Sequence, residues 1–367
     1  MRLHSLVLAC GFALASSSVA LAQRPSVLPP PPPGPAVTDQ PATPPPTAAA
    51  PAISERGLVT QSPSGLEVRA GDAAPSRWQS DLDRLDSDLR LRLLTANDPR
   101  VEWLAGAIDP SDVESQVRHY AAARTAAPDD RLYLASLGVA CLHPVRPTLA
   151  PCDAVDRLAD WARRDVDNGI PSLLLAGRAR QRGQADTVAS YVEQAANAPR
   201  FDDYWSQHSQ RWWQYLRGVD VGIDAAAKAE AAAHYGSMND LAWAQPLRLI
   251  CAEGTTRPDR LRVACASLGT AMMSRGASFA LRRAGARVAE INASDAAARS
   301  AAQSRGARIL AMTARCTQLS PDFTTALESA QPATRARGVE DFSTWANAQA
   351  QLGEVASCER VLASAPR

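Results

Sequence analysis

The chain has almost no net charge, and this absence excludes one large class of proteins. Its 39 lysine and arginine residues are balanced by 38 aspartate and glutamate residues. Proteins that bind nucleic acid neutralise many phosphates and carry a clear basic excess, so we expect no nucleic-acid partner. Long apolar runs are also lacking after residue 22. We therefore expect no transmembrane segment in the mature chain.

Motifs for catalysis and for cofactor binding are missing as well. The sequence has no GxSxG, no HExxH, no glycine-rich phosphate loop and no CxxCH. It has no CxxC pair, and no metal-ligand spacing relates the histidines outside the N-terminal region, His119, His143, His208 and His234. We expect no enzymatic activity, no cofactor and no metal ion.

The N-terminus predicts export. Arg2 precedes an apolar run from Leu6 to Leu14, and the small-residue site Ala20-Leu21-Ala22 follows. This layout is typical of a cleaved secretory signal peptide. We expect cleavage after Ala22 and a periplasmic or secreted protein. Lipidation at Cys10 is an alternative that the sequence leaves open.

Residues 23–75 are expected to form a disordered linker. They begin with a proline- and alanine-rich tract, RPSVLPPPPPGPAVTDQPATPPPTAAAPA, which has little charge and no aromatic residue. Such a composition cannot bury enough apolar area to fold and favours an extended polyproline conformation. The tract could act as a spacer, as a ligand for a proline-binding module or as a solvated leader.

From Trp78 onward the apolar residues recur at helical spacing. Intervals of three and four residues predict one helix that ends before Asn97, and they separate Leu82, Leu85, Leu89 and Leu93. Prolines and glycines then cut the chain into short segments, and alternating strand patterns are hard to find. We predict an all-α domain over residues 76–367, with helices of about ten to eighteen residues.

Three segments share one spacing. A bulky residue beside a small one stands eight residues before a glycine in Leu175-Ala176 with Gly183, Leu268-Gly269 with Gly276, and Trp345-Ala346 with Gly353. A small residue lets two antiparallel helices approach each other, and a glycine ends the first helix so that the chain turns back.

This spacing resembles that of tetratricopeptide and Sel1-like helical hairpins. The resemblance covers about half of the mature chain, and the intervals between its units are uneven. The unit around Gly276 departs from the pattern, because Gly285 stands where an aromatic residue is expected. The resemblance implies an α-hairpin repeat solenoid with degenerate repeats, and an irregular helical array is the alternative.

The resemblance also implies a ligand surface on the concave side of the first helices. A protein or peptide partner in the cell envelope would bind there. By register, the implied ligand-binding residues are Arg180, Gln181, Thr270, Ser274, Glu340, Asn347 and Gln351.

The stretch FDDYWSQHSQRWWQYLR, from Phe201 to Arg217, is dense in aromatic residues. If exposed, Trp205 and Trp213 could bind an envelope glycan such as peptidoglycan. Aromatic residues at helical spacing also form hydrophobic cores, so a buried role is the alternative. Arg178 and Arg182 likewise could hold an anionic ligand or belong to a solvated face that pairs with acidic residues.

Seven cysteines are present, and loss of Cys10 with the signal peptide would leave six. An even number in an exported protein predicts disulfides, although six cysteines allow fifteen connectivities. We predict that neighbours pair, as Cys141 with Cys152, Cys251 with Cys265, and Cys316 with Cys358. The first bridge would clamp a proline-containing loop where the tight turn of a hairpin is missing.

Overall fold

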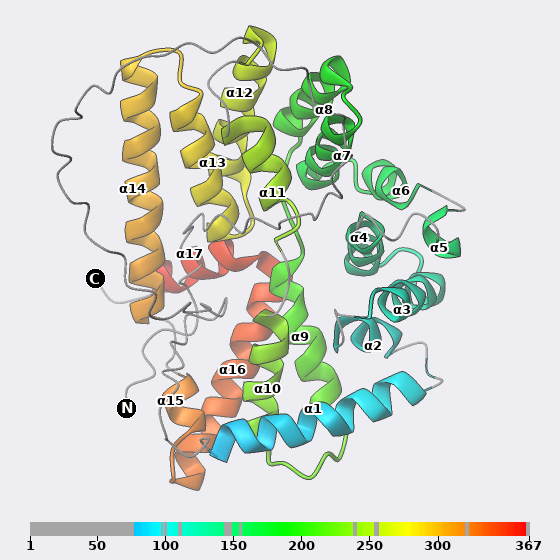
Figure 1. The fold of residues 1–367 in the computed structure, drawn as a ribbon. Coiled ribbons are helices and arrows are strands. Elements are labelled where there is room, and N and C mark those ends of the chain that lie inside the picture. The colour runs from blue at the N-terminus through cyan, green and yellow to red at the C-terminus, as the bar shows by residue number, and fades with distance from the viewer. Residues whose placement is uncertain are drawn as a thin grey trace, which may run out of the picture. The chain divides into compact units, whose positions relative to one another are not determined.

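The computed structural model describes residues 77–96, 98, 101–108, 112–142, 149–153, 156–237, 241–252, 257–319 and 323–364. The predicted signal peptide, its cleavage and lipidation sites, and the predicted linker lie outside this range. The described residues form seventeen α-helices, one π-helix and no β-strand, which confirms the all-α class (Figure 1). None of these helices is both long enough and apolar enough to cross a membrane.

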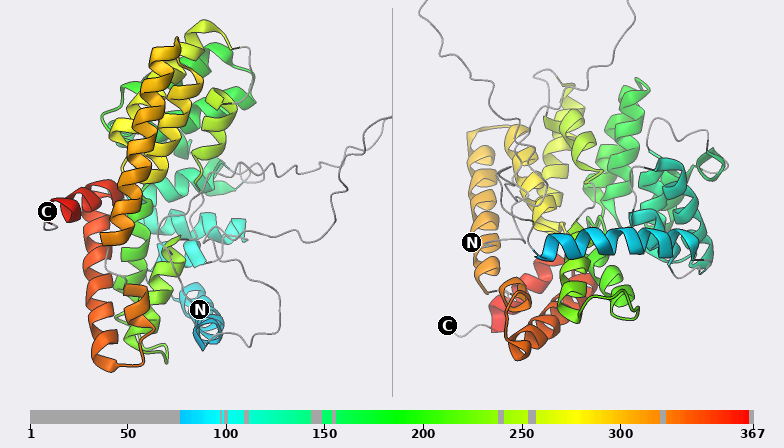
Figure 2. Two further views of the ribbon diagram at one scale, coloured as in Figure 1. Left: turned by 90° about the vertical axis from the view of Figure 1, so that its left-hand side faces the viewer. Right: turned by 60° about the horizontal axis from the view of Figure 1, so that its bottom comes forward.

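The N-terminal helices are α1 (Arg77–Thr95), α2 (Glu102–Ile108), α3 (Val113–Ala126), α4 (Arg131–Ala140), α5 (Ala150–Asp153) and α6 (Arg157–Arg164). The first four helices pack on one another in sequence order, α5 packs on α3, and α6 packs on α4. In α1, Leu85, Leu89 and Leu93 are buried, which confirms the predicted apolar face. That face packs against α2 and α10 (Ala225–Ser237), and Figures 1 and 2 show α1 crossing α10.

Two of the three predicted hairpins form compact helix pairs. The first joins α7 (Gly169–Gln181) to α8 (Ala185–Asn197) through Gly183, whose φ is 70°. The second joins α12 (Asp259–Arg275) to α13 (Phe279–Ile291) through Gly276. Helix α8 packs on α12, and α13 packs on α14 (Ala296–Leu319). Helices α7, α8, α12, α13 and α14 therefore form a row of neighbouring helices (Figure 1).

The third glycine also ends a helix, but the next helix turns differently. Gly353, with φ 79°, separates α16 (Pro332–Leu352) from α17 (Glu354–Ser364). Helix α17 packs on α14 as well as on α16. A small apolar cluster that includes Ile309 and Val355 fills the space between α13, α14 and α17. A tetratricopeptide-like repeat stays a prediction.

Helices α9 (Trp205–Leu216), α10, α15 (Phe323–Leu327) and α16 form a second group, in which α9 packs on α10 and α16, and α16 packs on α15. Helix α11 (Ala244–Leu247) continues into the π-helix η1 (Arg248–Ala252), and both pack on α7. Helices α14 and α16, with 24 and 21 residues, exceed the expected length. Neither has an internal proline, and alanine, the best helix former, is frequent in both.

The cysteines pair as predicted. Cα–Cα distances are 5.5 Å for Cys141–Cys152, 5.5 Å for Cys251–Cys265 and 5.7 Å for Cys316–Cys358. The first bridge joins the end of α4 to α5, the second joins η1 to α12, and the third joins α14 to α17. Each bridge therefore fixes one helix against another.

Glycine also sets how closely α12 and α13 approach each other. A Cβ atom added to Gly285 would lie 2.4 Å from the backbone nitrogen of Met273 and 2.7 Å from the oxygen of Gly269. An added Cβ on Gly269 would lie 2.4 Å from the backbone nitrogen of Ala289. Gly285, which departs from the tetratricopeptide pattern, is thus the residue that admits the facing backbone.

We predict that Gly285→Ala lowers the free energy of unfolding by about 1–3 kcal/mol, because the new methyl group forces two backbones apart. Urea denaturation of the mature chain measures the change. Gly218→Ala is the matched control, since its added Cβ would come no closer than 3.5 Å to another atom. Equal stability of the two variants would contradict the close contact.

Candidate functional site

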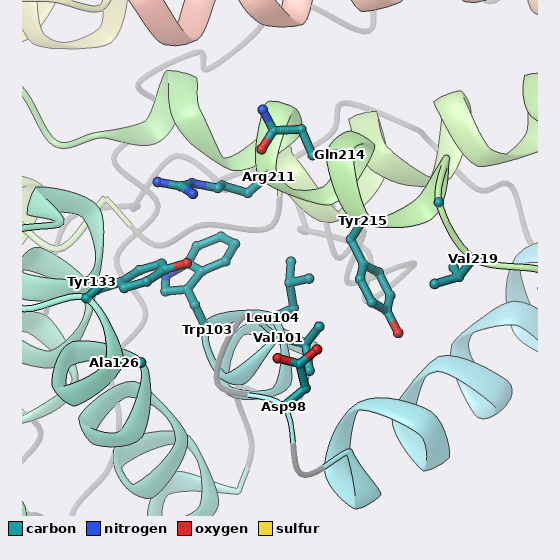
Figure 3. Close-up of a pocket in the computed structure, with 12 residues that line it drawn as sticks. Asp98, Val101, Trp103, Leu104, Ala126, Tyr133, Arg211, Gln214, Tyr215 and Val219 are labelled. Atoms are coloured by element: carbon teal, nitrogen blue, oxygen red, sulfur yellow. The ribbon is translucent and has the colours of Figure 1, made fainter.

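A pocket of about 620 Å³ opens between α2, the end of α3, α4 and α9 (Figure 3). Apolar residues make up much of its lining. It is lined by Asp98, Val101, Trp103, Leu104, Ala126, Ala127, Tyr133, Arg211, Gln214, Tyr215, Gly218 and Val219. We call this pocket the α9 groove, because its residues on and after α9 follow that helix from Arg211 to Val219.

One end of the α9 groove is held by an ion pair. Arg211 donates a hydrogen bond to Asp130, and its guanidinium lies 5.3 Å from the centre of the Tyr133 ring. Asp130 also caps α4, where it accepts a hydrogen bond of 3.0 Å from the backbone N–H of Leu132. Because both partners are engaged, Arg211 is fixed on the rim rather than free to swing.

The other end of the groove carries a second tyrosine between opposite charges. Tyr215 is half-buried, one helical turn after Arg211. Burial raises the pKa of Tyr215; the positive charge of Arg92 acts against this rise, and the negative charge of Asp98 adds to it. In Figure 3 the Tyr215 ring points towards the side of the pocket on which Asp98 lies.

Two of the aromatic rings of the groove are almost completely buried. Trp103 is 1% exposed, and its Nε1 donates a hydrogen bond of 2.8 Å to Ser136 Oγ. Tyr133 is 7% exposed, and burial raises its pKa. A sugar ring stacks on an exposed aromatic face, whereas an apolar side chain needs only an apolar recess. The groove therefore suits a side chain better than a sugar.

Trp213 of the predicted aromatic ligand site is buried. This residue is 5% exposed, and its Nε1 donates a hydrogen bond of 3.1 Å to Ser343 Oγ. Its ring packs edge-to-face on Phe342, with centroids 5.6 Å apart. Trp205 is half-buried at the start of α9. The buried alternative therefore holds for Trp213, because its face of α9 packs on α16.

His208 is buried on a different face of α9, which packs against α2. Its ring lies edge-on to Trp103, with centroids 4.9 Å apart. Burial lowers the pKa of His208 to about 3, so the imidazole is neutral at physiological pH. A neutral, enclosed imidazole is not poised for acid–base chemistry.

The polar residues implied by the tetratricopeptide resemblance lie on α7, α12 and α16. Those exposed to solvent are Arg180, Gln181, Thr270, Ser274, Glu340 and Gln351. The hydroxyls of Thr270 and Ser274 donate to carbonyl groups of their own helix, both at 3.0 Å. Asn347 is half-buried and accepts a hydrogen bond of 3.0 Å from Gln210 on α9. Their part in ligand binding stays a prediction.

Two of the arginines on and near α7 form ion pairs with neighbouring acidic residues. Arg178 donates hydrogen bonds of 2.8 Å and 2.6 Å to Asp156. Arg164 donates one of 3.1 Å to Asp160. Arg178 thus matches the paired, solvated alternative. Arg182 is exposed just after α7, and an anionic ligand there stays a prediction.

A buried polar junction joins the end of α6 to the segment before α9. Asp165 is 1% exposed and accepts hydrogen bonds from Trp161 Nε1 at 3.1 Å and Tyr204 Oη at 2.6 Å. It also accepts one of 2.9 Å from Asn168 Nδ2, and Arg200 forms an ion pair with it. Tyr204 has φ 61°, a backbone conformation uncommon for a residue other than glycine. We call these side chains the Asp165 junction.

Backbone hydrogen bonds extend this junction to the C-terminal helices. The N–H of Gly169 donates to the Arg200 oxygen at 2.9 Å, and the N–H of Ala277 donates to the Phe201 oxygen at 2.8 Å. The N–H of Val355 then donates to the Ala277 oxygen at 3.1 Å. The beginnings of α7 and α17 and the α12–α13 turn are thereby joined through residues 200–201.

Three acidic residues near these backbone hydrogen bonds have pKa values that are raised by burial. Burial, and then the charge of Asp203, raise the pKa of Asp202 to about 6. Burial also raises the pKa of Asp203, which accepts a hydrogen bond of 2.8 Å from Trp243 Nε1. Burial raises the pKa of Glu354 to about 7, although the N–H of Phe279 donates to this carboxyl at 2.8 Å.

Comparisons with protein-family models, curated proteins and solved structures found no match. Over the described ranges, no group of three or more histidine, cysteine, aspartate or glutamate residues could hold a metal ion. The patterns in the sequence did not identify the α9 groove. Tyr215 belongs to the aromatic stretch, but the other aromatic residues that line the groove come from α2 and α4, far away in the chain.

We predict that Glu354 contributes a fall in stability as pH rises from about 5 to about 7.5, because a raised folded-state pKa favours the protonated carboxyl and ionisation favours the unfolded chain. The lowered pKa of His208 acts in the opposite direction, so the Glu354 contribution is isolated by comparing the protein with a variant. Glu354→Gln should remove up to about 3 kcal/mol of this fall, given a pKa of about 7 against an ordinary 4.5. Urea denaturation at both pH values measures it. An unchanged pH dependence in the variant would contradict the assignment to Glu354.

Proposed function

We propose that the protein is an exported helical-array protein that binds an extended segment of a partner protein in the α9 groove, without catalytic activity. The observation that carries this proposal is the distribution of apolar and polar residues along the groove. An apolar floor, formed in part by Val101 and Leu104, lies between two polar ends that contain Arg211 with Asp130 and Tyr215 with Asp98.

The length of the groove supports an extended peptide as the ligand. Arg211 and Val219 are eight residues apart in a mostly helical segment, which corresponds to about 12 Å at 1.5 Å per residue. An extended peptide rises about 3.3 Å per residue, so three or four residues fit along this length. One large apolar side chain would enter the recess, and the polar ends would bond to peptide groups on either side.

Several features support export and a repeat-protein architecture. The sequence from Met1 to Ala22 has the layout of a signal peptide, and three disulfides suit an oxidising compartment such as the periplasm. The hairpins at Gly183 and Gly276 support a tetratricopeptide-like array, a fold that commonly binds proteins through its helices.

Binding of an envelope glycan is the second candidate. The tyrosines and charged side chains of the groove could bond to sugar hydroxyls. The near-complete burial of Trp103 and Tyr133 weakens this candidate, because these two rings have little face left for stacking.

Photo-crosslinking in intact cells tests the proposal. A photo-reactive residue at Gln214, which is exposed on the groove rim, should give one dominant protein adduct, and the captured segment should contain a large apolar residue. Tyr215→Ala should reduce this adduct about tenfold, because it removes one wall of the recess.

A photo-reactive residue at Arg217 is the matched control, since this residue is exposed at the end of the same helix and does not line the groove. Equal labelling at Gln214 and Arg217 would contradict a specific site. Glycan fragments at Gln214 without a protein adduct would overturn the peptide proposal in favour of the second candidate.

A further inference from the structure

Helix α14 carries a one-sided charge in a chain that is otherwise balanced. Its 24 residues, AAARSAAQSRGARILAMTARCTQL, contain four arginines and no aspartate or glutamate. Over the whole chain, 39 basic residues match 38 acidic ones. The positive charge is therefore concentrated locally rather than spread through the composition.

One side of α14 is committed to the fold. Ala302, Ile309, Thr313 and Cys316 are buried. This side packs on α13 and α17, and the Cys316–Cys358 disulfide fixes it there. The helix ends the row that begins with α7, and the left view of Figure 2 looks onto its outer side. That outer side is consequently held in place as a rigid helical surface.

The arginines in the middle and the C-terminal part of α14 have no acidic partner among the described side chains. Arg305, Arg308 and Arg315 are exposed, and no described carboxylate forms an ion pair with them. Arg299, nearer the N-terminus, is different, because its charge adds to the lowering of the Glu290 pKa that hydrogen bonds from Gln303 and Arg287 produce. Like charges three residues apart, such as Arg305 and Arg308, destabilise a helix by a few tenths of a kcal/mol, about 0.2–0.5.

Small residues separate these arginines on the outer side. Spacings of three and four residues relate the exposed Ser300, Ser304, Ala307, Ala311 and Ala314. Such short side chains allow the backbone of a second helix to come close, and arginines at the edges then reach its acidic side chains. Guanidinium groups pair with carboxylates through two parallel hydrogen bonds, which favours acidic side chains as their partners.

The surface suits a protein helix better than a membrane. Helices that lie on membranes bury bulky apolar residues in the lipid. Among the side chains of α14 that the structure describes, Ile309 is buried against the fold, and Leu310 is exposed, at 53%. Alanine, serine and arginine provide little area for insertion into lipid.

We propose that the outer face of α14 binds an acidic amphipathic helix of a partner protein, whose carboxylates pair with Arg305, Arg308 and Arg315. This surface lies on a different helix from those that form the α9 groove and is argued from different residues, so it goes beyond the proposed function. The protein would then have two binding surfaces.

The test uses a synthetic helical peptide of about twenty residues, alanine-rich, with glutamate at every third or fourth position. Fluorescence anisotropy measures its binding to the mature chain. Arg308→Glu combined with Arg315→Glu should weaken binding about tenfold or more, because attraction becomes repulsion. Binding should also weaken as salt is added, since exposed charges are screened.

Three controls make the result decisive. Arg262→Glu changes a partly exposed arginine on α12 and should leave binding unchanged, and Tyr215→Ala in the α9 groove should do the same. The same peptide with glutamine in place of glutamate should not bind. No binding of the acidic peptide, equal binding of the glutamine peptide, or tighter binding to phosphatidylglycerol vesicles than to the peptide would overturn the proposal.

Discussion

The buried carboxylate of Asp165 is the constraint on which the arrangement of the helices depends. A buried negative charge is costly unless hydrogen bonds and an opposite charge compensate it. Here Trp161, Asn168 and Tyr204 donate hydrogen bonds, and Arg200 supplies the charge. These partners come from both sides of the α7–α8 hairpin, so satisfying one carboxylate fixes where that hairpin begins and ends.

The Asp165 junction also sets the direction of α9. Tyr204 immediately precedes this helix, and its left-handed backbone turns the chain into it. Arg211 and Tyr215, which form the two ends of the α9 groove, follow within about three helical turns. Because residues 200–201 also bond to the helices α7 and, through Ala277, α17, the groove and the C-terminal helices share one support.

The features that depend on local patterns could be predicted from the sequence. The leucines of α1, the glycines that end helices at Gly183 and Gly353, and the two disulfides that close loops of 11 and 14 residues are encoded within short segments. The α9 groove could not be predicted, because Tyr133 and Arg211 meet only after the chain has folded. Trp213 was ambiguous for a related reason: helical periodicity gives the face of a residue but not what covers that face.

Hydrogen exchange of Asp165→Asn tests the central role of this carboxylate most directly. If the junction supports the start of α7, the α12–α13 turn and the start of α17, the amides of Gly169, Ala277 and Val355 should exchange about tenfold faster or more in this variant. Amides within α14 should stay protected. Asp259→Asn, at an exposed residue, is the control and should change none of these rates. Faster exchange confined to residues 161–168, with Ala277 and Val355 unchanged, would contradict the account.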